Sequence, residues 1–283
     1  MKTICQAIGC LLTITTTANA AVLVAYTMNG NLQETFGTGA QNNILSARDN
    51  NFGFVTPNAN AFVAGVPGLG GQALQLRSGG SNVGWVSTPD GPDPDLGGLP
   101  STTDWTVELY LQPKALPGDN SFERLALHWT VGDAYHLSIH NEPGPTGPRI
   151  DIYTNYTVSG EQHVNGLADL ALNTWYYAAA VKSGNTVSLY LDGALQGSYI
   201  VSGSMMNDNT DLFFGSYDGQ FPFIGYVDDI RIWNQAVSPA YLSSRAALLV
   251  PEPGTFAMLV CGGLAMWPSC RRMRIRNETS RRI

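Results

Sequence analysis

Residues 173–193 (NTWYYAAAVKSGNTVSLYLDG) decide the fold of this chain. They contain two hydrophobic runs, 175–182 and 186–191, and the second run alternates hydrophobic and polar side chains with the period of a half-buried strand. A Ser-Gly-Asn turn separates the runs, and the Asp192-Gly193 dipeptide that follows them is typical of a type I′ hairpin turn. The stretch therefore predicts consecutive antiparallel strands.

Short strands of this kind extend over residues 21–234. Residues 105–112 alternate with a period of two, so Val107, Leu109 and Leu111 are expected on one face. Gly, Pro, Asn and Asp separate the segments, and no internal repeat is visible, which favours an all-β, two-sheet antiparallel sandwich. The further predicted strands are 22–27, 73–77, 83–87, 123–129, 135–140, 149–154, 195–201, 211–215 and 224–234.

One short helix is expected near the end of this region. Ser238 is a favourable N-cap and Pro239 suits the first helical position, so the helix should run from there to about Leu248.

The 173–193 hairpin resembles the hallmark hairpin of the LamG-like jellyroll, a family of the concanavalin A-like lectin/glucanase superfamily. Residues 225–238 (GYVDDIRIWNQAVS) are similar to the last strand and turn of that family, and residues 23–26 (LVAY) are similar to its opening strand. The resemblance covers residues 21–248. It implies one domain, built as a jellyroll of about twelve to fourteen strands.

Residues 1–20 predict a secretory signal peptide. Lys2 supplies a basic start, residues 4–14 are mostly apolar, and residues 18–20 (ANA) form a small-x-small cleavage site. A polar N-terminus and a lipoprotein signal ending at Cys10 are the alternatives.

Residues 250–276 combine a Pro-Glu-Pro motif, an apolar segment over 255–267 and an arginine cluster. This order resembles the PEP-CTERM sorting signal of exopolysaccharide-producing Gram-negative bacteria. The resemblance implies a membrane sorting protease as a partner, transient anchoring in the inner membrane, and release to the cell surface or extracellular matrix. An uncleaved membrane anchor is the alternative. The residues that carry the motif are Pro251, Glu252, Pro253, Arg271 and Arg272.

The formal net charge of −7 is unevenly distributed along the 283 residues. Residues 21–250 contain 8 basic and 20 acidic side chains, a formal charge of −12. A domain this acidic argues against nucleic acid or an anionic membrane as the main partner. The four cysteines lie in the two predicted signals, so the mature domain is expected to lack disulfides and thiol chemistry. They are Cys5, Cys10, Cys261 and Cys270.

Catalytic motifs are sparse. Superfamily members that hydrolyse β-glucans carry a Glu-x-Asp-x-x-Glu arrangement on one strand, and this sequence has none. Glu108 stands alone on its strand. Asp228 and Asp229 are adjacent, so a regular strand would point them to opposite faces, where they cannot act together on one glycosidic bond. We therefore expect a non-enzymatic protein, with a glycoside hydrolase built from loop acids as the alternative.

The histidines offer one metal hypothesis. His136 and His140 share a strand face but lie about 13 Å apart, too far for one zinc ion. His128 would stand opposite His136 if residues 130–134 formed a hairpin turn. A polar outer face is the simpler interpretation.

Calcium is a second metal hypothesis, because it prefers carboxylate and carbonyl oxygens. Asp90, Asp93 and Asp95 lie in one Pro-rich loop, for which a solvated turn is the alternative. The resemblance adds Asp228 as a possible calcium ligand, with hydrogen bonding to loop amides as its alternative.

Carbohydrate binding requires exposed aromatic rings beside hydrogen-bonding groups. Trp105 and Trp175 lie on strongly patterned strands and are expected in the core. The candidate platforms beside loops are Tyr153, Tyr156, Tyr217 and Phe221, for which closing the ends of the sandwich is the alternative. The predicted function is an exported module that binds polysaccharide in the cell envelope or extracellular matrix. A structural or adhesive surface protein that binds another protein is the alternative.

Overall fold

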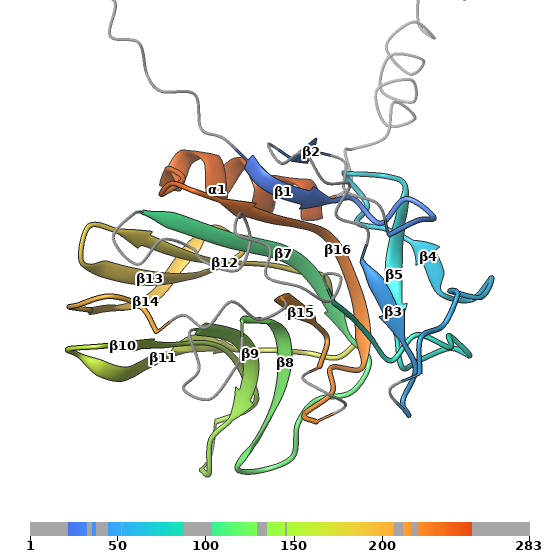
Figure 1. Ribbon diagram of the computed structural model, residues 1–283, viewed down its shortest axis with the longest axis horizontal. Coiled ribbons are helices and arrows are strands. Elements are labelled where there is room, and N and C mark those ends of the chain that lie inside the picture. Colours follow the sequence, from blue (N-terminus) through green and yellow to red (C-terminus); the bar gives the residue numbers. More distant parts are fainter. Residues whose placement is uncertain are drawn as a thin grey trace, which may run out of the picture.

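Two antiparallel sheets form a jellyroll sandwich, as Figure 1 shows, so the predicted all-β fold is confirmed. The structure is a computed structural model. It describes residues 22–32, 36–37, 45–51, 53–87, 104–128, 135–144, 146–206, 212–216 and 220–250.

Sheet A has the strand order β14-β13-β12-β7-β16-β1-β2, and β5 pairs with both β16 and β4. Its strands are β1 (Val22–Tyr26), β2 (Phe36–Gly37), β4 (Phe62–Ala64), β5 (Gln72–Leu76), β7 (Trp105–Pro113), β12 (Tyr176–Ser183), β13 (Thr186–Leu191), β14 (Ala194–Ile200) and β16 (Gly225–Trp233).

Sheet B has the strand order β11-β10-β9-β8-β15-β6-β3. Its strands are β3 (Ser46–Arg48), β6 (Trp85–Ser87), β8 (Ser121–His128), β9 (Tyr135–Asn141), β10 (Arg149–Tyr156), β11 (Gly160–Asp169) and β15 (Leu212–Phe214).

The predicted hairpin is present as β12 and β13, which pair from Ala178↔Leu191 to Ser183↔Thr186. Asp192 and Gly193 have φ angles of 50° and 77°, the left-handed geometry that a type I′ turn requires at both central residues. The turn leads directly into β14, so the local sequence specifies three consecutive strands of sheet A.

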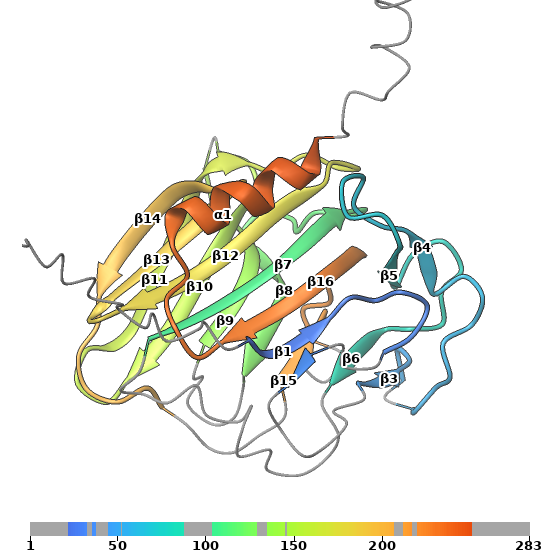
Figure 2. The same cartoon turned by 90° about the horizontal axis from the view of Figure 1, so that it is seen from above.

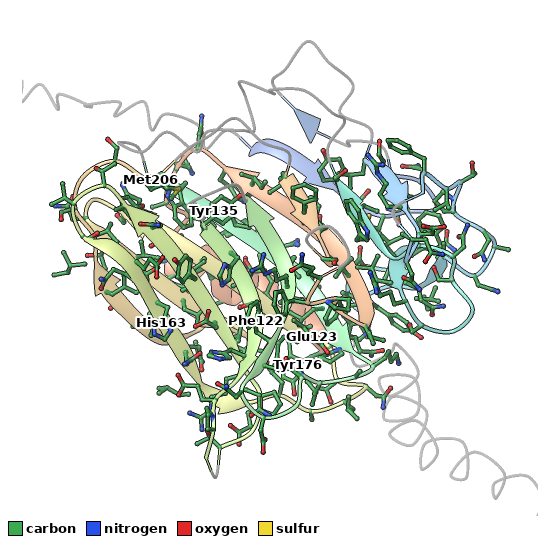
Figure 3. The ribbon with its side chains drawn as sticks, turned by 60° about the horizontal axis from the view of Figure 1, so that its bottom comes forward. Phe122, Glu123, Tyr135, His163, Tyr176 and Met206 are labelled. Atoms are coloured by element: carbon green, nitrogen blue, oxygen red, sulfur yellow. The ribbon has the colours of Figure 1, made fainter. Side chains whose placement is uncertain are left out.

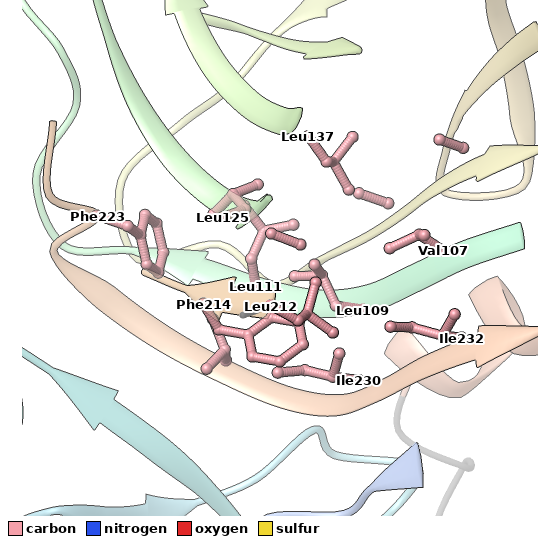
Figure 4. Close-up of a cluster of buried hydrophobic side chains, with 14 of the residues drawn as sticks. Val107, Leu109, Leu111, Leu125, Leu137, Leu212, Phe214, Phe223, Ile230 and Ile232 are labelled. Carbon is pink, nitrogen blue, oxygen red and sulfur yellow. The ribbon is translucent and has the colours of Figure 1, made fainter. Parts of the chain in front are cut away.

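The core lies between the two sheets. Residues of β7, β8, β9, β15 and β16 meet there, as Figure 4 shows, and the alternating Val107, Leu109 and Leu111 all point into it. Trp105 is fully buried in the same cluster, which confirms its predicted core position.

Helix α1 (Pro239–Ala246) and the 3-10 helix η1 (Ala247–Leu249) lie on the outer face of sheet A (Figure 2). Ser238 caps α1 by accepting a hydrogen bond from the Tyr241 amide at 3.2 Å, as its sequence position predicts. Trp175 is partly buried in the second hydrophobic cluster under this helix. In the part of the chain that the structure describes, no helix is long and apolar enough to cross a membrane.

The sequence did not reveal every strand. β11, of ten residues, and the short β2, β3 and β4 were not predicted, so the described chain has sixteen strands rather than twelve to fourteen. The proposed pairing of His128 with His136 is wrong by one residue, because His128 pairs with Tyr135 and Leu127 pairs with His136.

Candidate binding site

The outer face of sheet B lies on the side of the molecule opposite α1. Leu137, Ile139, Ile150 and Ile152 point into the core, so the residues that alternate with them on β9 and β10 face outward. Figure 3 shows this sheet toward the reader, with Phe122 and His163 among its labelled side chains. The outward residues are Phe122, Arg124, His136, Ser138, His140, Asp151 and Tyr153.

Four rings follow one another across this face. Tyr153 stacks on His136 with centroids 4.6 Å apart and planes 2° apart. The Phe122 ring is parallel to His136 within 6° at 6.1 Å, and it stacks on Phe221 at 4.2 Å. We call Tyr153, His136, Phe122 and Phe221 the aromatic row. Three of its rings come from adjacent strands and the fourth comes from the segment that precedes β16.

Phe221 ends the aromatic row in an unusual conformation. Its φ angle is 50°, in the left-handed region that a bulky residue rarely occupies, and 39% of its surface is exposed. The Arg124 amide donates to the Phe221 carbonyl at 3.0 Å, which fixes the loop against β8. Phe122 covers one face of the Phe221 ring, and the Arg124 guanidinium carbon lies 5.2 Å from the centre of the same ring.

Polar groups lie beside the aromatic row. Asp151 is 3% exposed, and its carboxylate lies 3.5 Å from Nδ1 of His163 on β11. Ser138 donates to the same carboxylate at 3.4 Å. Burial raises the pKa of Asp151, whereas its hydrogen bond to His163 raises the pKa of that imidazole. The His163 side chain is 54% exposed, so it presents a polar ring to the solvent.

His136 is a neutral member of the aromatic row. Burial lowers the pKa of its ring to about 3, and the charges of Arg124, His140 and His163 act in the same direction. In the described structure its Nδ1 atom has no hydrogen-bond partner. The ring is buried between Tyr153 and Phe122, so His136 acts as a packed aromatic member of the row.

The structure places the four predicted platform residues in different surroundings. Tyr153 and Phe221 belong to the aromatic row. The alternation of β10 places Tyr156 on the face that packs in the core, where it is 1% exposed. Its ring is therefore not accessible to a ligand. Tyr217 lies outside the described residues.

The aspartate pair on β16 departs from a regular strand. A register shift between Asp228 and Arg231, with a φ angle of 43° at Asp229, turns both carboxylates toward the α1 side. The expectation that they point to opposite faces is therefore wrong. Asp228 is 2% exposed and accepts the Val66 amide at 3.1 Å, while Asp229 binds Arg231 and Arg245.

The surroundings of Asp228 are those of a buried carboxylate that bonds a loop amide, the alternative expected for it from the sequence. One of its oxygens is used by the Val66 amide, and burial raises its pKa to about 7. Within the described ranges, no group of three or more His, Cys, Asp or Glu side chains is placed to hold a metal. Asp90, Asp93 and Asp95 lie outside those ranges, as do the motif residues Pro251, Glu252, Pro253, Arg271 and Arg272.

Glu108 belongs to a polar network under α1 rather than to an exposed site. Tyr177, Trp233 and Tyr241 donate to its carboxylate, the last two at 3.2 and 2.8 Å. Burial raises the pKa of Glu108 despite these donors. The network fastens α1 to sheet A and leaves the outer face of sheet B as the accessible sheet face.

The arrangement of sheets and helix defines a lectin-like jellyroll. Residues 80–243, more than half of the chain, match the family model described as the concanavalin A-like lectin/glucanases superfamily. The chain belongs to this superfamily. No curated protein matches it.

Solved structures share the fold at low sequence identity. Domain 4 of AbnA, a GH43 extracellular arabinanase from Geobacillus stearothermophilus solved with arabinotriose, aligns with a TM-score of 0.58 and 17% identity over 80% of this chain and 98% of that one. The binding domain of botulinum neurotoxin DC aligns in complex with SialylT (TM-score 0.59, 11% identity) and with rat synaptotagmin II (TM-score 0.57, 12% identity). Each toxin match covers 82% of this chain and 52% of the toxin chain, so this chain spans about half of their length.

What sequence reasoning missed was the combination of outward residues on β8, β9 and β10. His136 and His140 were assigned to one outer face, and that face is present. The alternating positions of Phe122 and Arg124 on β8, and of Asp151 and Tyr153 on β10, likewise indicate side chains that share one outer face. The pairing that places these strands side by side is not visible in the sequence.

Proposed function

We propose that this protein is a non-enzymatic module that binds a polysaccharide on the outer face of sheet B. The observation that carries the proposal is Phe221, a partly exposed aromatic residue held at a φ angle of 50°. Backbone strain of this kind costs about 1–3 kcal/mol and is concentrated at functional sites. Glycine would suit the backbone better, so the presence of a phenylalanine there supports a role for its ring.

The other members of the site supply what a sugar requires. Aromatic rings pack against sugar C–H groups, while the exposed imidazole of His163, held by the buried Asp151, offers a polar group to a sugar hydroxyl. The formal charge of −12 over residues 21–250 disfavours polyanions, so a neutral polysaccharide is the preferred class. The arabinotriose complex of the AbnA domain makes arabinan a suitable probe.

Export and sorting are part of the same proposal. Residues 1–20 would direct secretion. Residues 250–276 would hold the protein transiently in the inner membrane of a Gram-negative-type bacterium, until a sorting protease releases it to the surface or matrix. Mass spectrometry of the exported protein tests both steps: loss of both segments is expected, and an intact 271–283 segment on a surface-located product would contradict sorting.

Calcium is proposed only for the loop that contains Asp90, Asp93 and Asp95. The donors around Asp228 do not support it there. Glycan binding measured with and without a chelator separates a calcium-dependent site from the calcium-independent aromatic row.

A protein-binding role is the second candidate. Val158 and Ile200 are each 73% exposed, near the place where the backbone of residues 157–159 bonds that of residues 202–204. Exposed apolar side chains of this kind occur at protein interfaces. Adhesion would then depend on Val158 and Ile200, and not on Phe221.

A polysaccharide panel that includes arabinan and β-glucan tests the proposed function. We expect binding without release of reducing sugar, and loss of binding in Phe221→Ala but not in Leu172→Ala, an exposed apolar control. Absence of binding to every polysaccharide would contradict the proposal. Release of reducing sugar would replace it with the hydrolase alternative.

A further inference from the structure

Residues 220–224, which we call the rim segment, are attached to the sandwich at both ends. Ser216 donates through its hydroxyl group to the Gln220 carbonyl at 2.8 Å. At the other end, the amides of Lys114 and Ala115 donate to the Ile224 carbonyl at 2.8 and 3.2 Å. Between these ends Phe223 is fully buried in the core, and its amide donates to the Gly215 carbonyl at 2.8 Å. The position of Phe221 on the aromatic row therefore depends on these anchors and on the contacts of the rim segment with β8.

Three consecutive residues of β8 hold the rim segment, each in a different way. The Phe122 ring stacks on Phe221, and the Arg124 amide donates to the Phe221 carbonyl. Between them, Glu123 accepts a hydrogen bond from the Ile224 amide. Figure 3 labels Phe122 and Glu123 next to each other near the lower end of the sheet.

Glu123 is placed where an ionised carboxylate is unfavourable. It pairs with Ile139 on β9, so its side chain points toward the core side of the sheet, and only 7% of it is exposed. Among the described residues, one carboxyl oxygen accepts from Ile224 and the other, Oε2, has no hydrogen-bond partner. A buried charge without partners is costly, whereas a neutral carboxyl group is far less so.

We propose that Glu123 is a positioning residue for the polysaccharide site: it accepts a hydrogen bond from the rim segment at a buried position that favours a neutral carboxyl group, so protonation of Glu123 favours the closed segment and keeps Phe221 on the aromatic row. This inference rests on the proposed function and names the group that controls the site. Binding should then be tightest in mildly acidic solution.

The electrostatic surroundings of Glu123 agree with this role. Burial raises its pKa to about 8, and only the hydrogen bond from Ile224 opposes the rise. The charged and titratable groups of the neighbouring elements face away from Glu123: His136 and His140 of β9 face the outer side of sheet B, and Asp228, Asp229 and Arg231 of β16 lie on the α1 side of sheet A. Arg124 faces the opposite side of β8, Lys114 donates to the Asn173 side chain, and Asp119 accepts from Asn141. Glu123 is thus protonated at neutral pH when the rim segment is closed.

Opening of the rim segment exposes Glu123 to water, where its carboxyl group titrates at the ordinary value near 4.5. Opening is therefore coupled to loss of one proton between about pH 4.5 and 8. In that window the opening equilibrium should rise about tenfold for each pH unit and level off above pH 8.

Hydrogen exchange measures this opening without any ligand. We expect the protection factor of the Arg124 amide, corrected for the intrinsic exchange rate, to fall about tenfold per pH unit up to pH 8. In Glu123→Gln it should be independent of pH, while Glu161→Gln, an exposed control on β11, should behave as the unmodified protein. A flat profile in the unmodified protein, or the same slope in Glu123→Gln, would overturn the proposal.

Two further measurements complete the test. If Glu123→Gln does not fold, NMR titration of the Glu123 carboxyl group in the unmodified protein decides, since a midpoint near 4.5 overturns the proposal and one near 8 supports it. Arabinan binding is measured in parallel across the same pH range. Absence of binding at every pH contradicts the proposed function, while the exchange profile still decides the role of Glu123.

Discussion

The attachment of α1 gives the sharpest prediction about stability. Asp229 is 3% exposed and lies between two guanidinium groups. Arg231 binds it through two hydrogen bonds of 2.9 and 3.0 Å, and Arg245 of α1 binds it from the other side. Loss of the Asp229 carboxylate leaves two guanidinium groups without their partner, whereas loss of the Arg245 side chain leaves Asp229 bound to Arg231.

Asp229→Asn removes the carboxylate that both guanidinium groups bind directly and keeps the shape of the side chain. Asparagine tolerates the φ angle of 43°, so the backbone adds little to the cost. Loss of one partner from a buried ion pair typically costs 3–5 kcal/mol, so we expect about 4 kcal/mol of lost unfolding free energy.

Arg245→Met is the milder change. Asp229 keeps both hydrogen bonds from Arg231, and methionine can retain apolar packing near the Tyr110 ring, over which the guanidinium carbon now lies at 4.9 Å. The charged hydrogen bond to Asp229 and the cation–π contacts with Tyr110 and Tyr177 are lost, and the expected cost is about 2 kcal/mol.

Urea denaturation of both single variants and the double variant measures these costs as a double-mutant cycle. The double variant should lose less than the sum of the single losses. Two results would refute the reasoning: a larger loss in Arg245→Met than in Asp229→Asn, or a loss below about 1 kcal/mol in Asp229→Asn, the range of a surface pair.

Three further predictions concern sheet B and the rim segment. Glu123→Gln should have nearly the same stability as the unmodified protein at pH 4 but be about 3 kcal/mol more stable at pH 7. The reason is that the raised pKa keeps Glu123 protonated in the native state while the unfolded chain ionises it, which destabilises the native state of the unmodified protein as the pH rises. Equal differences at both pH values in urea denaturation would contradict this. For His136 the sign is opposite, since its pKa is lowered to about 3 and the unfolded chain takes up the proton first as the pH falls below about 6.5. As the pH falls from 7 to 4, the unfolding free energy of His136→Phe should therefore rise by about 3 kcal/mol relative to that of the unmodified protein. Calorimetry measures both proteins over this range, and an equal pH dependence of their stabilities would count against a buried neutral ring. Phe221→Gly should change the unfolding free energy by less than about 1 kcal/mol, because relief of backbone strain offsets the lost stacking on Phe122, yet it should abolish polysaccharide binding; a large loss of stability with binding intact would assign Phe221 a purely structural role.

Local sequence patterns predicted the hairpin of β12 and β13, the capped helix and the buried Trp105, because each depends on alternation or on neighbouring residues. β11 escaped prediction because it is an edge strand with mostly polar or small residues, so hydrophobic alternation is weak there. The bulge at Asp229 escaped for a different reason, since its geometry is fixed by contacts with Arg245 from outside the strand.

The candidate site was only partly predictable. Tyr153 and Tyr156 were chosen because a loop was expected at residues 154–155, but β10 continues through those residues, so its pleat turns Tyr153 outward and buries Tyr156. Phe221 was chosen because it follows the turn-forming sequence 218–220. Phe122 meets Phe221 across about 100 positions of sequence, and such long-range contacts leave no local signal.

The central claim is that a polysaccharide binds the outer face of sheet B. NMR chemical-shift mapping with a bound polysaccharide tests it most directly, using arabinan first. We predict perturbations at Phe122, Tyr153 and Phe221, with little change at Tyr190 and Tyr241 on the α1 side. Perturbations confined to the α1 side, or to Val158 and Ile200, would contradict it.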